Sequence, residues 1–318
     1  MSNVFLHCLQ TLNAIHRNEL SSVTRGVVFS ANHKREITIL LVGETGVGKT
    51  SVLNWIANTL LGVSPGQYDL QIHDAANEAG GSGRHSQTNR AQKYTLTSRN
   101  GFAVHILDTP GLADTRGLAQ DDMHKKSISE AIKSEIPAVD AVLILANGTL
   151  PRLSVGADYT LTTLTSIFPR TIANNIGVLI TNVPDELSCN FEVNSLPQAL
   201  LSAHVPLFML DNPIARERKF RDLQQDPQKR LRPDQRERMR MFVQETHKKA
   251  LNVFVELFDW IDQRTLQPTK DIMSLYEKTE EIEQHISETL ANLKQTLLKS
   301  QELASYMMQI EKAKAVSN

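Results

Sequence analysis

The feature that most constrains this chain is a glycine-rich stretch, Gly43-Glu44-Thr45-Gly46-Val47-Gly48-Lys49-Thr50. It fits the pattern G-x-x-x-x-G-K-[ST], in which backbone N–H groups surround a phosphate. Residues 37–42 before it are apolar and β-branched, which predicts a buried strand, and residues 51–61 after it carry apolar residues at helical spacing. A strand, a glycine loop and a helix N-terminus in this order form an anion site. The sequence therefore predicts a phosphate-binding P-loop rather than a chance glycine-rich turn.

The polar groups of this loop have distinct expected tasks. The Lys49 ammonium is expected to reach the β- and γ-phosphate oxygens of a nucleotide, and the Thr50 hydroxyl to hold Mg²⁺. The glycines let the backbone approach the phosphates closely. The residues expected to bind nucleotide in this stretch are Gly43, Glu44, Thr45, Gly46, Val47, Gly48, Lys49, Thr50 and Ser51.

Composition excludes several other classes of protein. The 318 residues carry a formal net charge of −1, so no overall field favours nucleic acid, and we expect no nucleic-acid partner. The two cysteines, Cys8 and Cys189, provide neither a disulfide framework nor a metal cluster. No apolar stretch reaches the roughly 18 residues of a membrane span, and the N-terminus lacks the pattern of a secretory signal. A cytoplasmic location is expected, with peripheral attachment to a membrane as an open alternative.

A long polar segment, residues 62–92, follows the helix that begins in the P-loop. Loops of this length inside a compact domain are usually functional or disordered. Nucleotide switches place their first mobile loop here, so the Thr88 hydroxyl is expected to complete the Mg²⁺ shell and to sense the γ-phosphate. The alternative is a solvated threonine in a loop.

The next strand carries a second phosphate-site signal. Asn100-Gly101 predicts a hairpin turn, and residues 102–107 predict the strand that returns from it. The strand ends at Asp108-Thr109-Pro110-Gly111, where an acidic residue is suited to a Mg²⁺ site. We expect Asp108 to serve the metal, and the N–H group of Gly111 to bond the γ-phosphate. D-x-x-G at this distance from a P-loop is typical of GTPases.

Two later strands are predicted to lead into base-binding loops. Residues 139–146 and 176–181 read as buried strands, and the second runs into Asn182-Val183-Pro184-Asp185. Guanine recognition uses N-K-x-D, in which the aspartate accepts hydrogen bonds that adenine cannot donate; here valine replaces the lysine. Asn182 and Asp185 are candidate base ligands, the alternative being a loop asparagine and a helix-capping aspartate. After a final strand at 206–210, Asn212 is expected to contact the guanine carbonyl or line its pocket, unless it only forms a turn.

Both ends of the chain are predicted to be helical. Residues 1–35 read as an amphipathic helix and linker, and residues 36–213 as the nucleotide-binding domain. Residues 214–318 read as a helical extension, with an amphipathic helix at 241–263 ended by Pro268. Within 272–310, apolar residues at 4-4-3-4 spacing fit either a coiled coil or a helix packed on the domain.

These motifs together resemble the immunity-associated nucleotide-binding GTPases (the GIMAP family). The resemblance rests on the P-loop, on Ser86-Gln87-Thr88 and on the stretch from Asp108 to Thr115, and it covers roughly residues 36–213. Septins and the chloroplast outer-envelope import-receptor GTPases share these features. Since Val183 departs from the base motif, the chain is best described as a divergent member of this group.

The resemblance implies a Ras-like α/β G domain, with a mostly parallel six-stranded sheet covered by helices on both faces. It also implies binding of GTP and GDP, slow hydrolysis, and dimerisation across the nucleotide face. Leu112 occupies the position where Ras-like enzymes place a water-orienting glutamine. We therefore expect a catalytic group in trans from a homodimer partner: Arg116 first, His124 second, or else Arg116 is a solvated loop charge.

Three functions remain open on the sequence. The first is a GTP-binding switch with low GTPase activity, and the second is a nucleotide-stabilised scaffold or filament with negligible turnover. The third is an ATPase. An effector protein or a membrane surface is expected to bind through the C-terminal helices.

Overall fold

The computed structural model describes most of the chain. The described residues are 34–63, 67–72, 91–98, 101–110, 130–153, 158, 161, 170–202, 205–226 and 231–316. The chain divides into two compact units, Met1–Ile272 and Met273–Asn318. The predicted N-terminal helix lies outside the described residues.

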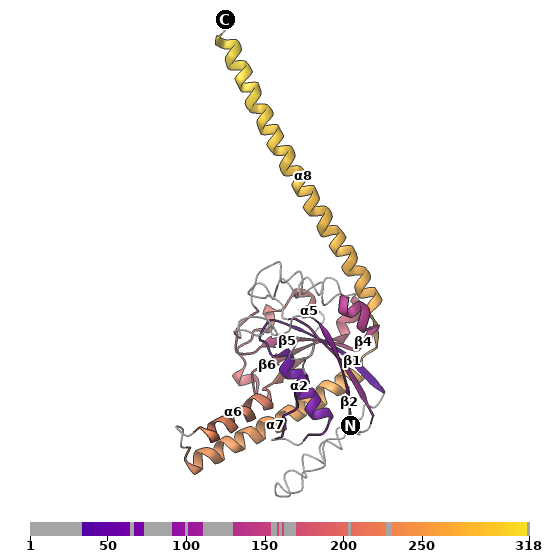
Figure 1. The fold of residues 1–318 in the computed structure, drawn as a ribbon, viewed down its shortest axis with the longest axis vertical. Helices are drawn as coiled ribbons and strands as arrows, with labels where there is room; N and C mark the ends of the chain where they lie inside the picture. The colour runs from indigo at the N-terminus through magenta and orange to yellow at the C-terminus, as the bar shows by residue number, and fades with distance from the viewer. Residues whose placement is uncertain are drawn as a thin grey trace. The chain divides into compact units, whose positions relative to one another are not determined.

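A six-stranded sheet forms the centre of the first unit (Figure 1). Its strands are β1 (Glu36–Gly43), β2 (Gln92–Thr97), β3 (Ala103–Asp108), β5 (Ala141–Asn147), β6 (Ile176–Thr181) and β7 (Leu207–Leu210). They lie in the order β2-β3-β1-β5-β6-β7, and every neighbouring pair is parallel except β2 with β3. The predicted Ras-like α/β fold is confirmed. Because five strands run the same way, the loops after β1, β3, β5, β6 and β7 all leave one edge of the sheet.

The central strands are apolar because both of their faces are covered. All six residues of β6 are buried. The strand predicted at 139–146 is interrupted, because the Asp140 carboxylate accepts hydrogen bonds from Thr38 N at 2.7 Å and Lys34 Nζ at 2.6 Å. The two residues before Asp140 form β4 (Ala138–Val139), which pairs antiparallel with β8 (Gln267–Pro268).

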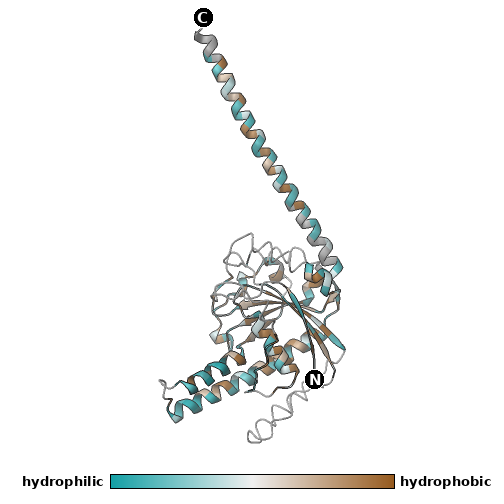
Figure 2. Cartoon of the chain, in the orientation of Figure 1, coloured by the Kyte–Doolittle hydropathy of each residue, from teal (hydrophilic) through white to brown (hydrophobic). Residues whose placement is uncertain are grey.

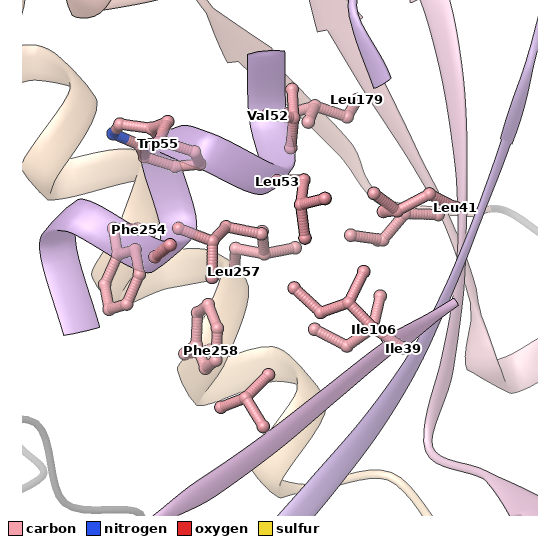
Figure 3. Close-up of a cluster of buried hydrophobic side chains, with 14 of the residues drawn as sticks. Ile39, Leu41, Val52, Leu53, Trp55, Ile106, Leu179, Phe254, Leu257 and Phe258 are labelled. Carbon is pink, nitrogen blue, oxygen red and sulfur yellow. The ribbon is translucent and has the colours of Figure 1, made fainter. Parts of the chain in front are cut away.

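Two helices supply most of the core on one face of the sheet. They are α2 (Lys49–Leu60), which leaves the P-loop, and α7 (Pro233–Asp262). Figure 3 shows side chains of both helices pointing toward residues of β1 and β3. Trp55 meets Phe254 edge to face at 5.7 Å, and Phe254 stacks on Phe258 at 4.3 Å. The remaining described helices and turns of this unit include η2 (Arg170–Asn175), η3 (Glu186–Ser188), η4 (Val193–Ser195), α5 (Gln198–Ser202) and α6 (Pro213–Gln225).

The helix predicted at 241–263 is longer than expected and belongs to the first unit. It starts at Pro233, pairs with α6, and buries its aromatic face against α2 and the sheet (Figures 1 and 3). A boundary at residue 213 was predicted where the composition becomes charged, whereas the compact unit runs to Ile272. Most charged residues of α6 and α7 are at least partly exposed, although Glu217 and Asp262 are buried, so the charged composition does not mark the end of the core.

The start of the long polar segment is fixed to α2 by two asparagines one helical turn apart. The Asn58 side chain bonds both backbone groups of Leu70: its Nδ2 donates to Leu70 O at 2.9 Å, and its Oδ1 accepts from Leu70 N at 3.3 Å. Asn54 Oδ1 accepts from Ile72 N at 2.9 Å, and Tyr68 is buried in the core. The side chains of α2 thus satisfy backbone groups that no strand pairs.

The second unit consists of one helix, α8 (Thr269–Val316), which begins within the last residues of the first unit. Figure 2 shows hydrophobic residues recurring along it among hydrophilic ones. Its predicted apolar stripe is 54–59% exposed at Ile282, Ile286, Leu290, Leu293 and Leu297. The coiled coil stays a prediction. Among the described helices, none has the length and apolar character needed to cross a bilayer.

Candidate functional site

The P-loop forms an open cradle between β1 and α2. Gly46 and Gly48 have φ angles of +78° and +104°, which disfavour side chains, and a Cβ at either would meet nothing within 4 Å. No side chain caps the N-terminus of α2, so its first N–H groups keep their donor capacity. The loop has the shape and the donors that an anion requires.

Lys49 lies folded into this cradle. Its Nζ donates to the carbonyl oxygens of Gly43 and Glu44, both at 2.9 Å, and the residue is 7% exposed. Burial lowers the pKa of Lys49 to about 8, although the charges of Asp108 and Glu44 oppose the shift. The ammonium therefore sits where its charge is poorly solvated, and a bound phosphate would supply the missing counter-charge.

Thr50 and Asp108, two of the three predicted metal ligands, lie in contact beside the cradle. Thr50 Oγ1 donates to Asp108 Oδ2 at 3.1 Å, across 58 positions of sequence. Thr109 Oγ1 donates to Leu41 O at 2.7 Å, which fixes the end of β3 beside β1. A hydroxyl and a carboxylate at this spacing are the oxygen ligands that Mg²⁺ takes alongside phosphate oxygens. The donor set fits Mg²⁺ held jointly with a nucleotide.

The remaining P-loop residues shape the cradle. Val47 is buried in the core, and Glu44 contributes its carbonyl to Lys49. The buried Thr45 hydroxyl has no hydrogen-bond partner among the described residues. An unpaired buried hydroxyl is costly, so a ligand oxygen here would relieve it. Ser51 accepts from Asn212 through its carbonyl.

The predicted base-binding loop follows β6 at the same edge of the sheet. Asn182 has φ of 64°, and its Nδ2 donates to Asn147 Oδ1 at 3.2 Å. The Asp185 Oδ1 atom caps η3, accepting from Ser188 N at 3.1 Å and Ser188 Oγ at 2.8 Å. These bonds, together with the positive charge of Lys249, lower the pKa of Asp185. The capping role anticipated as the alternative is present, and it uses Oδ1 rather than Oδ2.

Asn212 makes two contacts that the sequence did not predict. Its Oδ1 caps α6 through Ile214 N at 3.0 Å, and its Nδ2 donates to Ser51 O at 3.0 Å. In this arrangement the side chain ties the β7 loop to the first turn of α2. A contact between Asn212 and a guanine stays a prediction.

Two residues that contact the predicted site residues were not predicted from the sequence. Thr181 Oγ1 donates to Val47 O at 2.8 Å and to Ala146 O at 3.2 Å, so it joins β6 to the P-loop. Lys249 of α7 lies with Nζ 3.5 Å from Asp185 Oδ2. A buried threonine at a strand end gives only a weak signal, and a lysine 64 positions from its partner gives none.

The four predicted catalytic residues, Thr88, Gly111, Arg116 and His124, lie outside the described residues. The third predicted metal ligand, Thr88, is among them. Their roles stay predictions.

Comparison with known proteins places the chain in a family. The model of the AIG1 family matches residues 37–200, more than half of the 318 residues. This chain belongs to the AIG1 family. The family consists of GIMAP-type P-loop GTPases, so the recognition from motifs is confirmed, and this AIG1 chain is a G-domain protein of the GTP-binding kind.

Individual relatives of the AIG1 chain are distant. The tRNA modification GTPase MnmE of Pseudomonas putida is 29% identical over 148 residues, covering 46% of this chain and 27% of the relative. GTP-binding protein A of Dictyostelium discoideum is 26% identical over 163 residues, covering 51% of this chain and 30% of the relative. The AIG1 chain thus spans less than a third of the length of these relatives. The solved structure of Toc33 from Arabidopsis thaliana with GDP and Mg²⁺ aligns with 14% identity and a TM-score of 0.43, covering 84% of this chain and 96% of that one.

Proposed function

We propose that this protein is a guanine-nucleotide switch that binds GTP and GDP with Mg²⁺ and hydrolyses GTP slowly. One observation carries the proposal: a phosphate cradle, a hydroxyl–carboxylate pair and an ionised aspartate lie at one edge of one sheet. That edge is where open α/β sheets bind their ligands.

The phosphates would lie in the P-loop cradle. Backbone N–H groups of the loop and of the first turn of α2 would donate to them, and Lys49 would leave the Gly43 and Glu44 carbonyls to bond their oxygens. Thr50 and Asp108 would hold Mg²⁺, Asp108 directly or through water, with Thr88 completing the shell. Mg²⁺ in such a site neutralises charge on the phosphate oxygens.

The base would be read at the loop after β6. An ionised carboxylate is an acceptor only, and guanine offers it the N1–H and N2–H₂ donors, whereas adenine has no N1–H. The low pKa of Asp185 keeps it in that form at neutral pH. This favours GTP over the rival ATPase function.

Hydrolysis would be slow in a single subunit, because Leu112 has no group to hold the attacking water. The resemblance to nucleotide-face dimers motivates a homodimer in which Arg116 neutralises charge on the partner's transferring phosphoryl group. His124 is the second candidate. Arginine fingers accelerate such reactions by roughly 10³–10⁵. The competing function, a scaffold with structural nucleotide, predicts no such gain.

Two measurements on the full chain test the proposal. Calorimetric titration with GDP, GTPγS and ATPγS, run with light scattering on the same samples, should give binding of both guanine nucleotides and none of ATPγS. GTP turnover per subunit should rise with protein concentration as dimer forms, and Arg116→Ala should remove that rise while leaving GTPγS binding intact. Equal binding of ATPγS contradicts the base assignment, and turnover near zero at every concentration favours the scaffold.

We further propose a cytoplasmic location, on the basis of the cysteine content, and binding of an effector or a membrane surface by the C-terminal helices. The exposed apolar stripe of α8 supports an interaction role for that helix.

A further inference from the structure

The base loop lacks a lysine, and the structure shows what fills its place. Val183 is completely buried, with its side chain under Gly148. A Cβ on Gly148 would lie only 2.6 Å from Val183 Cγ1, so the two positions fit each other closely. Val183 therefore faces the core, where it cannot line a base site. An ammonium group beside Asp185 has to come from elsewhere in the fold.

Lys249 of α7 supplies that group. Its Nζ lies 3.5 Å from Asp185 Oδ2, and both side chains are partly exposed, at 46% and 38%. The two residues line the same hollow, of about 370 Å³, together with Phe208 and Met209 of β7 and with Asp211. A volume in this range suits a small planar ligand.

The hollow lies between β7, α7 and the loop that carries Asp185, and its lining combines apolar and charged side chains. Leu207, Phe208 and Met209 of β7 contribute apolar atoms to its lining, and the four-carbon stem of Lys249 adds another apolar surface. Oδ1 of Asp185 is occupied by two bonds from Ser188, which leaves Oδ2 as the acceptor on the side of Lys249. A carboxylate oxygen can accept more than one hydrogen bond, so Lys249 and a base can share it.

We propose that Lys249 is a positioning residue of the guanine site, taking from α7 the place that valine leaves empty at position 183. It orients the Oδ2 atom of Asp185 and lays its stem along the base. The inference rests on the proposed function, since it assigns a residue to the same site. It makes α7, which lies outside the family match at 37–200, a part of nucleotide recognition.

The test compares Lys249→Ala with a matched control on the same helix. Lys248→Ala removes one equally charged side chain from an exposed neighbouring position. GDP affinity of the full chain is measured by calorimetry, and displacement of a fluorescent GDP analogue by Mg²⁺-pyrophosphate measures phosphate binding without a base. Lys249→Ala should weaken GDP roughly five- to tenfold, the size expected for a partly exposed ion pair plus the contact of its stem. Pyrophosphate affinity should change less than about twofold, because the P-loop contacts remain.

Two more variants test whether Lys249 acts through Asp185. Lys249→Arg should retain most of the GDP affinity. In an Asp185→Asn background, Lys249→Ala should cost much less than in the wild type, because the amide that replaces the carboxylate carries no charge to orient. A purely structural role of Lys249 would instead lower GDP and pyrophosphate affinity together and lower the melting temperature.

The outcomes separate this inference from the function on which it rests. If the wild type prefers GDP to ADP but Lys249→Ala behaves like Lys248→Ala, the inference is wrong and the guanine site stands. Tighter GDP binding by Lys249→Ala also overturns it, because the ammonium would then compete with the base. If the wild type does not distinguish GDP from ADP, the proposed function itself fails.

Discussion

The phosphate half and the base half of the site are built in opposite ways. The P-loop, which forms most of the phosphate half, is one continuous stretch, in which Lys49 is buried and bonded to backbone carbonyls six and five positions away. The base half combines the loop after β6 with α7, and its central pair, Asp185 and Lys249, is partly exposed. The P-loop residues are close together in the sequence, and Lys49 is poorly solvated. The residues of the base half are far apart in the sequence and partly exposed to water.

This difference determines how much each charge contributes. A charge in a poorly solvated cradle interacts strongly with a ligand of opposite sign, while an exposed ion pair is screened by water. We therefore expect the phosphate half to supply most of the affinity and the base half to supply selectivity. The predictions that test this division are given from the largest expected effect to the smallest.

The largest effect is expected for Lys49→Ala. This variant removes the charge that the phosphates would pair with, and hydrogen bonds to charged groups contribute about 1.5–3 kcal/mol each. GDP affinity should fall by at least about 100-fold, to the point where calorimetry detects no binding. Circular dichroism of the same sample controls for folding. Wild-type affinity in a folded variant would refute the phosphate half.

The next largest effect is a change in the preference between guanine and xanthine nucleotides rather than a loss of nucleotide affinity. Asp185→Asn replaces a double acceptor by a group with one acceptor and one donor, which matches xanthine better than guanine. The ratio of GDP to XDP affinity should fall by about tenfold or more, the discrimination that one well-formed pair of hydrogen bonds supplies. Pyrophosphate affinity should stay unchanged. An unaltered GDP/XDP ratio would show that Asp185 does not contact the base.

The same contrast explains what could be predicted from the sequence. The strand, loop and helix of the P-loop were predictable, because they follow one another and the pattern of glycines is specific. The pairing of Thr50 with Asp108 was also predictable, because parallel strands bring their carboxyl ends to one edge. These inferences needed only local patterns and one topological rule.

The contributions of α7 could not be predicted in this way. Its apolar spacing predicted a helix, but nothing in the spacing showed that Phe254 packs against Trp55 of α2 and stacks on Phe258. The contact of Lys249 with Asp185 depends on that packing. The interruption at Asp140 was missed because its cause, the backbone N–H of Thr38 and the Lys34 ammonium, lies about a hundred residues away.

A third prediction uses the pKa of about 8 for Lys49 in the free protein. A bound phosphate would raise that pKa again, so binding takes up a proton at pH values above 8. GDP affinity should then decrease above pH 8, by up to about tenfold per pH unit. Calorimetry in buffers of different ionisation enthalpy checks the proton uptake directly. An affinity that does not change between pH 8 and 9.5 would contradict the buried, poorly solvated state of Lys49.

The free energy of unfolding of the free protein should rise with pH above 8, whereas the affinity for GDP should fall. The pKa is lowered from 10.5 to about 8, so below pH 8 the charged side chain costs about 3 kcal/mol of folding free energy. The unfolded chain binds more protons than the folded one between pH 8 and 10.5, so this cost is relieved as the pH rises. Burial raises the pKa of Tyr68, and its contribution to stability is lost only above pH 10. The contribution of Lys49 to stability therefore changes at lower pH than that of Tyr68.

The smallest effect is expected at the contact that joins the two halves. Thr181→Val keeps the shape of the side chain but removes the donor to Val47 O, at 2.8 Å, and to Ala146 O, at 3.2 Å. Losing one such bond costs about 1 kcal/mol. Because Val47 lies in the P-loop, part of that cost should appear as a two- to fivefold weaker affinity for pyrophosphate as well as for GDP.

Thr95→Val is the matched control, since Thr95 lies on β2 at the far edge of the sheet and its hydroxyl bonds His105 Nδ1 of the neighbouring strand. Thr181→Val should thus weaken both ligands equally and leave the GDP/XDP ratio intact, whereas Lys249→Ala should weaken GDP alone. If Thr181→Val instead changes only the GDP/XDP ratio, the threonine belongs to the base half, and the two halves are not as separate as their geometry indicates.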